Sequence, residues 1–292
     1  MDGFRVEDGL AVGMPRSSLY SKRYHRPFHG ARTETAPRNH VELCTAATLI
    51  LPPDAVISHR SAALLHGIPL PRSAEPRDVD VCVFEPAHRV KARGVIGHRI
   101  TPNGQRQLWM HGVRVFAPEE AWVQLGSILT TEELIVAGDY VVTGDQPYNG
   151  SAPPATTGQL ESALERYGAR RGARTLRSAF ARIRYGSLSP QETRLRLALE
   201  DAGLPTPEPN YRVGGDDGRT AAMIDLAYPA AGVAIEYLGD HHRLTAEAYR
   251  KDIARREWLV QRGWNVVFVT AADEFGAVAE RVRTALRASR GG

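Results

Sequence analysis

Apolar residues recur at helical or strand spacing from residue 41 onward, and proline or glycine separates the segments. In the first half of the chain the pattern predicts helices over 41–51, 58–66 and 131–142, a helix that begins at Pro118, and strands over 78–84, 95–100 and 113–116. Residues 1–40 are rich in Arg, His, Pro and Gly and lack a clear period. They are expected to be either a loose arm or strands that the pattern does not resolve.

The last third of the chain has the clearest periodicity. A helix is predicted from Ser189 to about Ala202, followed by strands over 208–213, 221–228 and 233–238, a helix over 245–262, a strand over 264–270 and a helix over 274–288. Strand 233–238 is strongly apolar, as expected of a central strand. The αβββαβα order predicts a mixed sheet flanked by helices, preceded by a smaller α+β domain, and hence the α/β (α+β) fold class.

Composition suggests where the domains are divided. Residues 143–158 are rich in Pro, Gly, Ser and Thr and are the predicted linker. The predicted organisation is therefore an N-terminal arm, an α+β domain, the linker, an Arg-rich helical segment and a C-terminal domain, over 1–40, 41–142, 143–158, 159–185 and 186–292.

The net charge of +4 is concentrated in one segment. Residues 155–185 carry seven Arg against Glu161 and Glu165, whereas the residues before and after this segment are close to neutral. Arg binds phosphate in a bidentate manner, and a basic stripe is typical of nucleic-acid binding. DNA is therefore the expected partner, through Arg170, Arg171, Arg174 and Arg177; a solvated helix face is the alternative.

Other features bear on the compartment. No stretch approaches the ~20 apolar residues that span a bilayer, and the acidic N-terminus lacks the apolar segment of a signal peptide. Cys44 and Cys82 fit no metal spacing and are expected to be reduced, buried thiols. We therefore expect a cytoplasmic protein without a membrane partner. The sequence leaves open a protein partner or a homodimer.

Two acids on adjacent predicted strands are the candidate chemistry. Asp225 and Glu236 are separated by a short turn near Pro229, so a hairpin would bring both carboxylates to one end of the sheet. Carboxylates are the ligands that Mg²⁺ prefers, and hydrolysis of a phosphodiester needs such a cation. Mg²⁺ (or Mn²⁺) is therefore the expected cofactor. The spacing of the two acids is by itself weak evidence for a metal site, because acids at strand ends are commonly solvated.

The neighbouring motifs strengthen this interpretation. SPQETRLRLAL, IDLAYPAAGVAIEYLGDHHR, Y-x-x-D-x-x-R and GWNVVFVT occur in this order over residues 187–275. Together they resemble the Vsr-like family of PD-(D/E)XK endonucleases, which is related to the very-short-patch repair endonuclease. The resemblance implies a restriction-endonuclease-like fold and Mg²⁺-dependent DNA cleavage.

The resemblance also implies roles for particular residues. Asp225 and Glu236 match the family's metal-binding acids, and Glu192 matches a glutamate on the first helix that often points into the site. Glu192 also forms an S-x-x-E capping box with Ser189. His241 and His242 match a pair after the third strand, where His242 could bind phosphate or transfer a proton.

A further motif lies on the helix that follows. Tyr249, Asp252 and Arg255 are three residues apart and share one face of that helix. Arg255 is expected either to face DNA phosphate or to pair with Asp252.

One position departs from the family pattern. Leu238 occupies the third position of the E-x-K element, where the family has a polar residue. Lys251 is the only lysine after residue 186 and is our candidate for the missing catalytic lysine. Leu238 also leaves open a domain that binds DNA or metal without cutting.

The region over residues 41–142 has a resemblance of its own. HRSAALLHGIPLP, DVDVCVF and the segment from PEEAW to AGDYVV resemble part of the AbiE-type abortive-infection antitoxins, which implies a module that recognises DNA or a partner. Asp78 and Asp80 also allow a nucleotidyltransferase metal site, but acids on an exposed strand face are the simpler explanation.

The sequence thus predicts a metal-dependent DNA endonuclease or nickase in DNA repair or defence. One alternative is a DNA-binding, antitoxin-like regulator with a degenerate nuclease fold, and another is a partner-binding protein with no nucleic-acid role.

Overall fold

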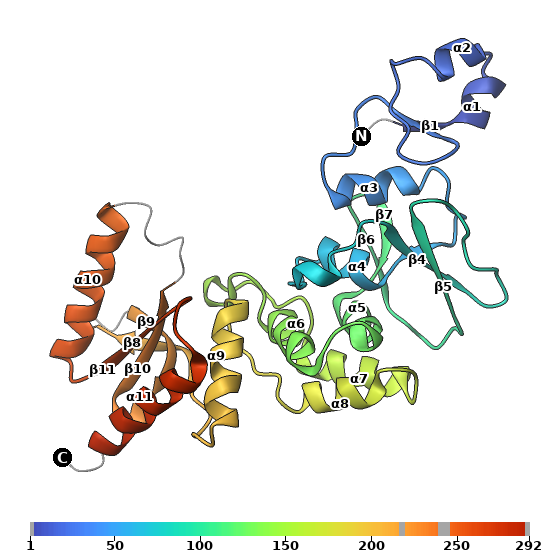
Figure 1. Cartoon of the computed structure of the whole chain (residues 1–292). Helices are drawn as coiled ribbons and strands as arrows, with labels where there is room; N and C mark the ends of the chain where they lie inside the picture. Colours follow the sequence, from blue (N-terminus) through green and yellow to red (C-terminus); the bar gives the residue numbers. More distant parts are fainter. Residues whose placement is uncertain (1–2, 216–219, 239–245, 290–292) are drawn as a thin grey trace. The chain divides into compact units, whose positions relative to one another are not determined.

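The structure, a computed structural model, describes residues 3–215, 220–238 and 246–289 (Figure 1). The chain forms two compact units, the first comprising residues 1–142 and 153–182, the second residues 143–152 and 183–292. The described part contains three sheets, two of which combine parallel and antiparallel strands. The predicted mixed α/β class is therefore confirmed.

The main sheet of the first unit has five strands in the order β5-β4-β3-β7-β6. Their bounds are β3 Val56–Ile57, β4 Val79–Phe84, β5 Val95–Ile100, β6 Gln107–Met110 and β7 Val113–Phe116. Sequence patterning predicted β4, β5 and β7 but missed β3 and β6. Strand β3 has only two residues, too few for an alternation, and β6 exposes Trp109 to solvent.

Helices α3 (His40–Ala47), α4 (His59–Leu65), α5 (Pro118–Gln124) and α6 (Thr131–Thr143) complete this part of the first unit. Helix α3 ends four residues earlier than predicted, in a turn that precedes Pro52. Proline disfavours helical geometry at the residue before it, which here is Leu51. Cys44 and Cys82 are free and buried, as expected.

The N-terminal segment is ordered structure rather than a loose arm. Strands β1 (Gly3–Arg5) and β2 (Ala31–Thr33) pair antiparallel, and helices α1 (Val6–Ala11) and α2 (Arg16–Leu19) lie between them. Leu19 and Ala31 are completely buried. Elements of three to six residues are too short to produce a recognisable period.

The Arg-rich segment forms helices α7 (Thr157–Tyr167) and α8 (Ala173–Phe180). Leu160 and Leu176 are fully buried, which anchors both helices in the first unit. Gly172 has φ +89° and lies so close to Gly126 that a Cβ atom would come within 2.1 Å of the Gly126 carbonyl oxygen. No larger residue fits there without movement of the backbone.

The predicted linker is divided between the units. Residues 143–152 pack with the second unit, where the Thr143 hydroxyl accepts the Gly186 N–H at 2.9 Å. The Tyr148 hydroxyl donates to the Asn210 carbonyl at 3.4 Å. Residues from 153 onward return to the first unit, and α7 begins inside the predicted linker.

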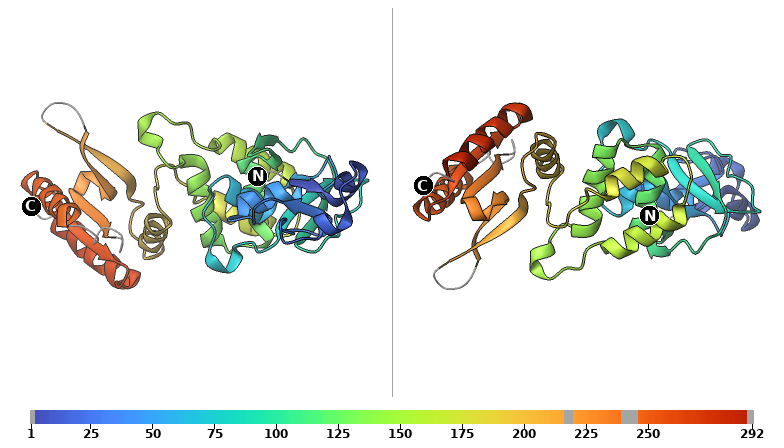
Figure 2. Two further views of the ribbon diagram at one scale, coloured as in Figure 1. Left: turned by 90° about the horizontal axis from the view of Figure 1, so that it is seen from above. Right: turned by 90° about the horizontal axis from the view of Figure 1, so that it is seen from below.

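The second unit has the predicted αβββαβα order. Its elements are α9 (Pro190–Asp201), β8 (Glu208–Gly214), β9 (Thr220–Tyr228), β10 (Val233–Leu238), α10 (Ala246–Gln261), β11 (Asn265–Thr270) and α11 (Phe275–Ala288). The sheet order is β11-β10-β9-β8, with β10 and β11 parallel and the other neighbours antiparallel. Helices α9 and α11 cover one face and α10 the other (Figures 1 and 2).

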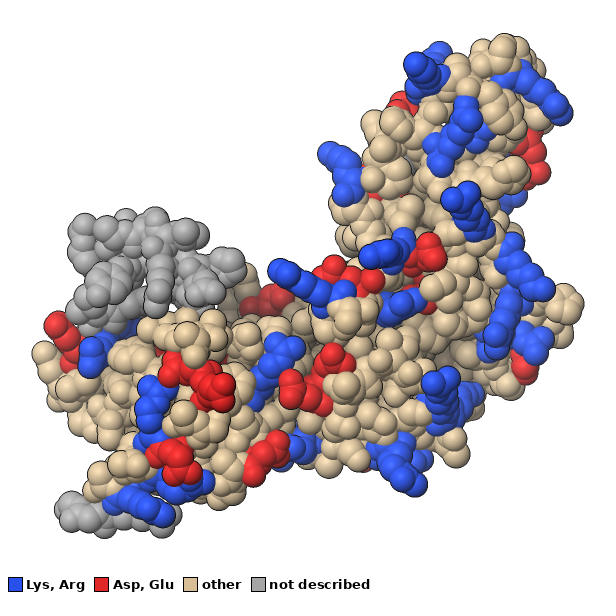
Figure 3. Space-filling model, viewed as in Figure 1, with Lys and Arg blue, Asp and Glu red and all other residues tan. Residues whose placement is uncertain are grey.

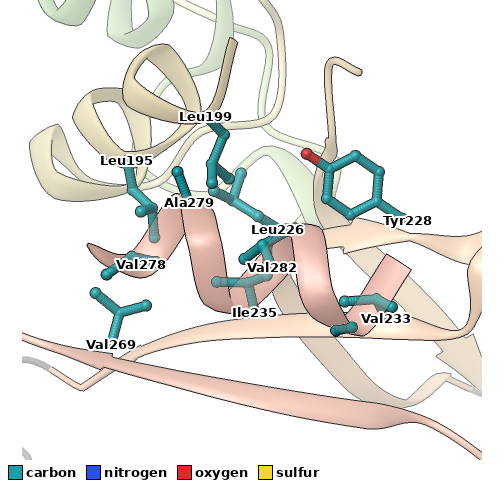
Figure 4. Packing of buried hydrophobic residues seen from close by; sticks show 11 residues of the cluster. Leu195, Leu199, Leu226, Tyr228, Val233, Ile235, Val269, Val278, Ala279 and Val282 are labelled. Carbon is teal, nitrogen blue, oxygen red and sulfur yellow. The ribbon is translucent and has the colours of Figure 1, made fainter. Parts of the chain in front are cut away.

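Hydrophobic contacts in the second unit hold helices against both faces of its sheet. Side chains of α9 and α11, among them Leu195 and Val282, pack against Ile235 and Leu226 of the sheet (Figure 4). On the opposite face, Leu259 of α10 packs with Ala234. Strand β10 is thus covered on both faces, which accounts for its almost continuous apolar sequence.

No helix among the described residues is both long and apolar enough to cross a membrane.

Candidate functional site

Asp225 and Glu236 lie where two central strands stop pairing. The β9–β10 ladder runs from Tyr228 and Val233 to Leu226 and Ile235, and the next pair would join Asp225 to Glu236. Instead, the Asp225 Oδ2 atom accepts the backbone N–H of Tyr237 at 2.7 Å. The Asp225 carboxylate therefore takes the place of a backbone acceptor and lies beside the residue that follows Glu236.

Glu236 is almost completely buried and bound to a cation. Its Oε2 atom accepts from Nη2 of Arg255 at 2.7 Å, while Nη1 of Arg255 donates to the Met223 carbonyl at 3.3 Å. The Glu236 side chain is 2 % exposed and that of Arg255 35 %. Arg255 of α10 thus neutralises Glu236 and joins the helix to β9.

Glu192 is buried at the start of α9. The Ser189 hydroxyl accepts the Glu192 N–H at 3.2 Å, as expected of a capping residue. The Glu192 Oε2 atom accepts the N–H of Leu188 at 2.9 Å and the side-chain amide of Asn210 at 2.7 Å. Glu192 therefore stabilises the first turn of the helix and contacts β8 through Asn210.

Asn210 is a residue that sequence reasoning missed. It is 3 % exposed and has φ +46°, a left-handed conformation that Asn tolerates better than most residues. Its side-chain amide donates to the Gly186 carbonyl and to Glu192. The neighbouring pairs of the β8–β9 ladder place Asn210 opposite Asp225, so Glu192 and Asp225 share this neighbour.

Several predicted residues lie outside the described part of the structure. These are His241, His242 and the side chains of Tyr249, Lys251 and Asp252. Leu238 is the last residue of β10, is partly buried and pairs with Thr270. Among the residues that are described, no group of three or more His, Cys, Asp or Glu side chains is arranged to hold a metal ion.

The four arginines of the predicted stripe are exposed. Arg177 donates to the Gly168 carbonyl at 3.1 Å, and the Arg170 guanidinium lies 5.7 Å from the centre of the Tyr167 ring. Arg166 of the same segment is different, because it pairs with the buried Glu120 of α5. Lys and Arg are also spread over the visible face of the first unit (Figure 3).

A second polar cluster lies inside the first unit, around Asp80. Its carboxylate binds Arg60 through two hydrogen bonds of 2.9 and 3.1 Å, and His98 at 2.9 Å. Burial raises the pKa of Asp80, but the hydrogen bonds from His98 and Arg60 outweigh it, so its pKa lies below the ordinary value. The prediction that Asp80 lies on an exposed strand face was wrong, because its side chain is completely buried.

His59 stacks on His98 at the edge of this cluster, with ring centres 3.7 Å apart. Burial, followed by the proximity of His98, lowers the pKa of His59 to about 3. The residue has φ +47°, and its N–H donates to the Gln124 side chain at 2.7 Å. The folded protein therefore keeps this imidazole neutral.

This neutral histidine predicts a loss of stability in mild acid. The unfolded chain binds a proton near pH 6.5 but the folded chain only near pH 3, so stability is complete above pH 6.5 and declines below it. Because His59 keeps some solvent exposure, we expect the free energy of unfolding to fall by about 1–2 kcal/mol between pH 7 and pH 5. Urea unfolding at both pH values measures the change.

The control is His59→Asn, since Asn accepts positive φ and does not titrate. We expect this variant to lose less stability than the wild type over the same interval. An equal loss in both proteins would assign the effect to His40 and His66, whose pKa values burial also lowers.

Comparison with known proteins gives a limited match. Over 136 residues, which are 45 % of its length, the chain is 31 % identical to "Uncharacterized protein MT2308" and to "Uncharacterized protein Rv2248", both from Mycobacterium tuberculosis. The match covers 49 % of each relative, so the chain spans about half the length of the curated relatives it matches. No protein-family model and no solved structure matches the chain.

Proposed function

We propose that this protein is a metal-dependent DNA endonuclease or nickase, with its active site in the second unit. The observation that carries the proposal is the interrupted ladder at β9 and β10. The hydrogen bond from Tyr237 to Asp225 fixes one carboxylate beside the strand that supplies Glu236. Two carboxylates are thereby held on adjacent central strands, next to an apolar core, as a preorganised metal site requires.

The donor chemistry fits a hard cation such as Mg²⁺ or Mn²⁺. Mg²⁺ is commonly held by one or two carboxylates, with water and substrate phosphate as the other ligands, so the pair Asp225 and Glu236 would suffice. Such an ion would neutralise charge on the phosphate and activate water. Arg255, already at 2.7 Å from Glu236, would remain close enough to contact the same phosphate.

Nicking of supercoiled plasmid DNA tests the proposal. We expect the 292-residue chain to convert the plasmid to the open circular form with Mg²⁺ or Mn²⁺, and we expect the conversion to stop when EDTA is added. Nicking that continues in EDTA would contradict a metal-dependent site. Catalytic roles for Glu192, His242 and Lys251 stay predictions, to be examined by Ala substitution in the same assay.

The exposed arginines of α8 and the preceding turn predict salt-dependent DNA binding. Each phosphate contact contributes about 0.9 to the slope of log affinity against log salt on duplex DNA. We expect the double variant Arg171→Ser, Arg174→Ser to reduce that slope by about 2. Fluorescence anisotropy over a series of salt concentrations measures it.

A control with the same charge change is Arg72→Ser, Arg77→Ser, which removes two exposed arginines elsewhere in the first unit. If both double variants reduce the slope equally, DNA is attracted by overall charge and the α7–α8 segment has no special role.

Two observations favour a second candidate, a DNA-binding regulator that does not cut. Leu238 offers no polar group at the third position of the E-x-K element, and Arg255 already neutralises Glu236. Tight, salt-dependent DNA binding without nicking in either metal would support this alternative.

A further inference from the structure

A cavity of about 630 Å³ lies in the first unit, apart from the Asp225 site. Its walls come from the N-terminal segment and from the chain just before β4 and β5, and include Tyr20, Arg26, His29, Arg32, Asp78 and Arg93. The volume lies within the range of about 300–1,000 Å³ that is typical of small-molecule sites. The cavity is therefore large enough for a ligand of nucleotide size.

Arg32 is the most informative wall residue, because it is a buried cation. It is 3 % exposed, and its guanidinium donates to the Leu19 carbonyl at 2.6 Å and to the Ala31 carbonyl at 2.7 Å. Those carbonyls fix its orientation but are neutral. No carboxylate in the described part of the chain forms an ion pair with Arg32. Burying a charge is costly, and an anion that pairs with it reduces this cost.

Two more guanidinium groups line the same cavity. The guanidinium carbons of Arg32 and Arg26 lie 4.7 and 5.3 Å from the centre of the Tyr20 ring, so two like charges lie close to this one side chain. Arg93 contributes a third from the loop before β5, while Asp78 is the one acid among the lining residues. Clustered guanidinium groups match the geometry and charge of a phosphate dianion.

We propose that this cavity binds the terminal phosphate group of a nucleotide, either free or at the end of a DNA strand. Tyr20 lines the cavity, and its ring packs against the guanidinium groups of Arg32 and Arg26, which helps to hold both groups in the cavity wall. Arg32, Arg26 and Arg93 would hold the phosphate. The proposal does not depend on the nuclease function, since every lining residue belongs to the first unit.

Binding of short single-stranded DNA by the whole 292-residue chain tests the proposal. The assay is fluorescence anisotropy in EDTA, so that no metal-dependent cleavage contributes. We expect a strand with a 5′-phosphate to bind about tenfold or more tightly than the same strand with a 5′-hydroxyl, as charged hydrogen bonds imply. Arg93→Ser, at an exposed position, should lose about tenfold in affinity for the phosphorylated strand.

Competitors distinguish the two sources of phosphate. Displacement by deoxythymidine monophosphate, but not by thymidine, would identify a free nucleotide as a ligand. Displacement by the phosphorylated strand alone would identify a DNA end. Either result supports the proposal.

Two further variants complete the experiment. Arg32→Gln, checked for an unchanged thermal transition, should remove the preference for phosphate, whereas Arg89→Ser, in the same loop as Arg93 but outside the cavity, should keep it. Equal binding of phosphorylated and unphosphorylated strands, or unchanged affinity in both Arg93→Ser and Arg32→Gln, would overturn the proposal. Neither result would bear on plasmid nicking, so the two proposals can fail separately.

Discussion

Asp225→Asn should lower Mn²⁺-dependent nicking of supercoiled DNA by at least roughly a hundredfold, because a metal ion at such a site contributes several kcal/mol to the transition state. Asn is the informative replacement. Its side-chain oxygen can still accept the Tyr237 N–H, so the strands should keep their arrangement while the negative charge is lost. Single-turnover rates of open-circle formation measure the effect.

The matched control for this variant is Asp273→Asn. Asp273 is also a carboxylate that accepts a backbone N–H at the end of a strand, here that of Thr270 at 2.8 Å, but it lies in the turn that follows β11. We expect Asp273→Asn to nick at the wild-type rate. If Asp225→Asn did the same, the site would not be at β9 and β10. Equal thermal transitions in both variants would exclude unfolding as the cause.

The second large effect concerns stability. Asp80→Asn should reduce the free energy of unfolding of the first unit by about 3 kcal/mol, because it breaks a buried charge pair and leaves Arg60 without its carboxylate. This loss of stability lies at the lower end of the range usual for a broken buried ion pair, because the Arg60 side chain is 22 % exposed and can be hydrated by solvent. For a unit of this size the thermal midpoint should fall by about 6–12 °C. Differential scanning calorimetry measures it.

The neighbouring acid supplies the control for Asp80. Asp78 is exposed and two residues away, so Asp78→Asn removes the same charge without breaking a buried pair. We expect its midpoint to stay within a degree or two of the wild type, as for ordinary surface changes. Similar losses in the two variants would mean that net charge, and not the pair with Arg60, determines the result.

Sequence patterning predicted the second unit well and the first only in part. The strand over 233–238 has the same bounds in the structure, because a short apolar run followed by a glycine is a strong strand signal. Strand β6 was missed because Trp109 is 72 % exposed and breaks any alternation. The N-terminal segment was left open because its buried residues are spread over elements of three to six residues, which are too short to show a repeated period.

The candidate site, too, could be predicted from the sequence only in part. Asp225 and Glu236 could be named from the predicted hairpin and from the motifs around them. The role of Asn210 could not be predicted, since its left-handed backbone and its hydrogen bonds to Gly186 and Glu192 arise only from tertiary packing. The contact of Asp80 with His98 requires the parallel pairing of β4 and β5, which spacing does not reveal.

The assignment of residues 143–152 to the second unit has a practical consequence. The polypeptide passes from one unit to the other after Val142, after Ala152 and after Arg182. A fragment cut at residue 186 would therefore omit the Tyr148 and Thr143 side chains that bind Asn210 and Gly186. Expression of the second unit alone calls for a circularly permuted or fused design that restores this short peptide.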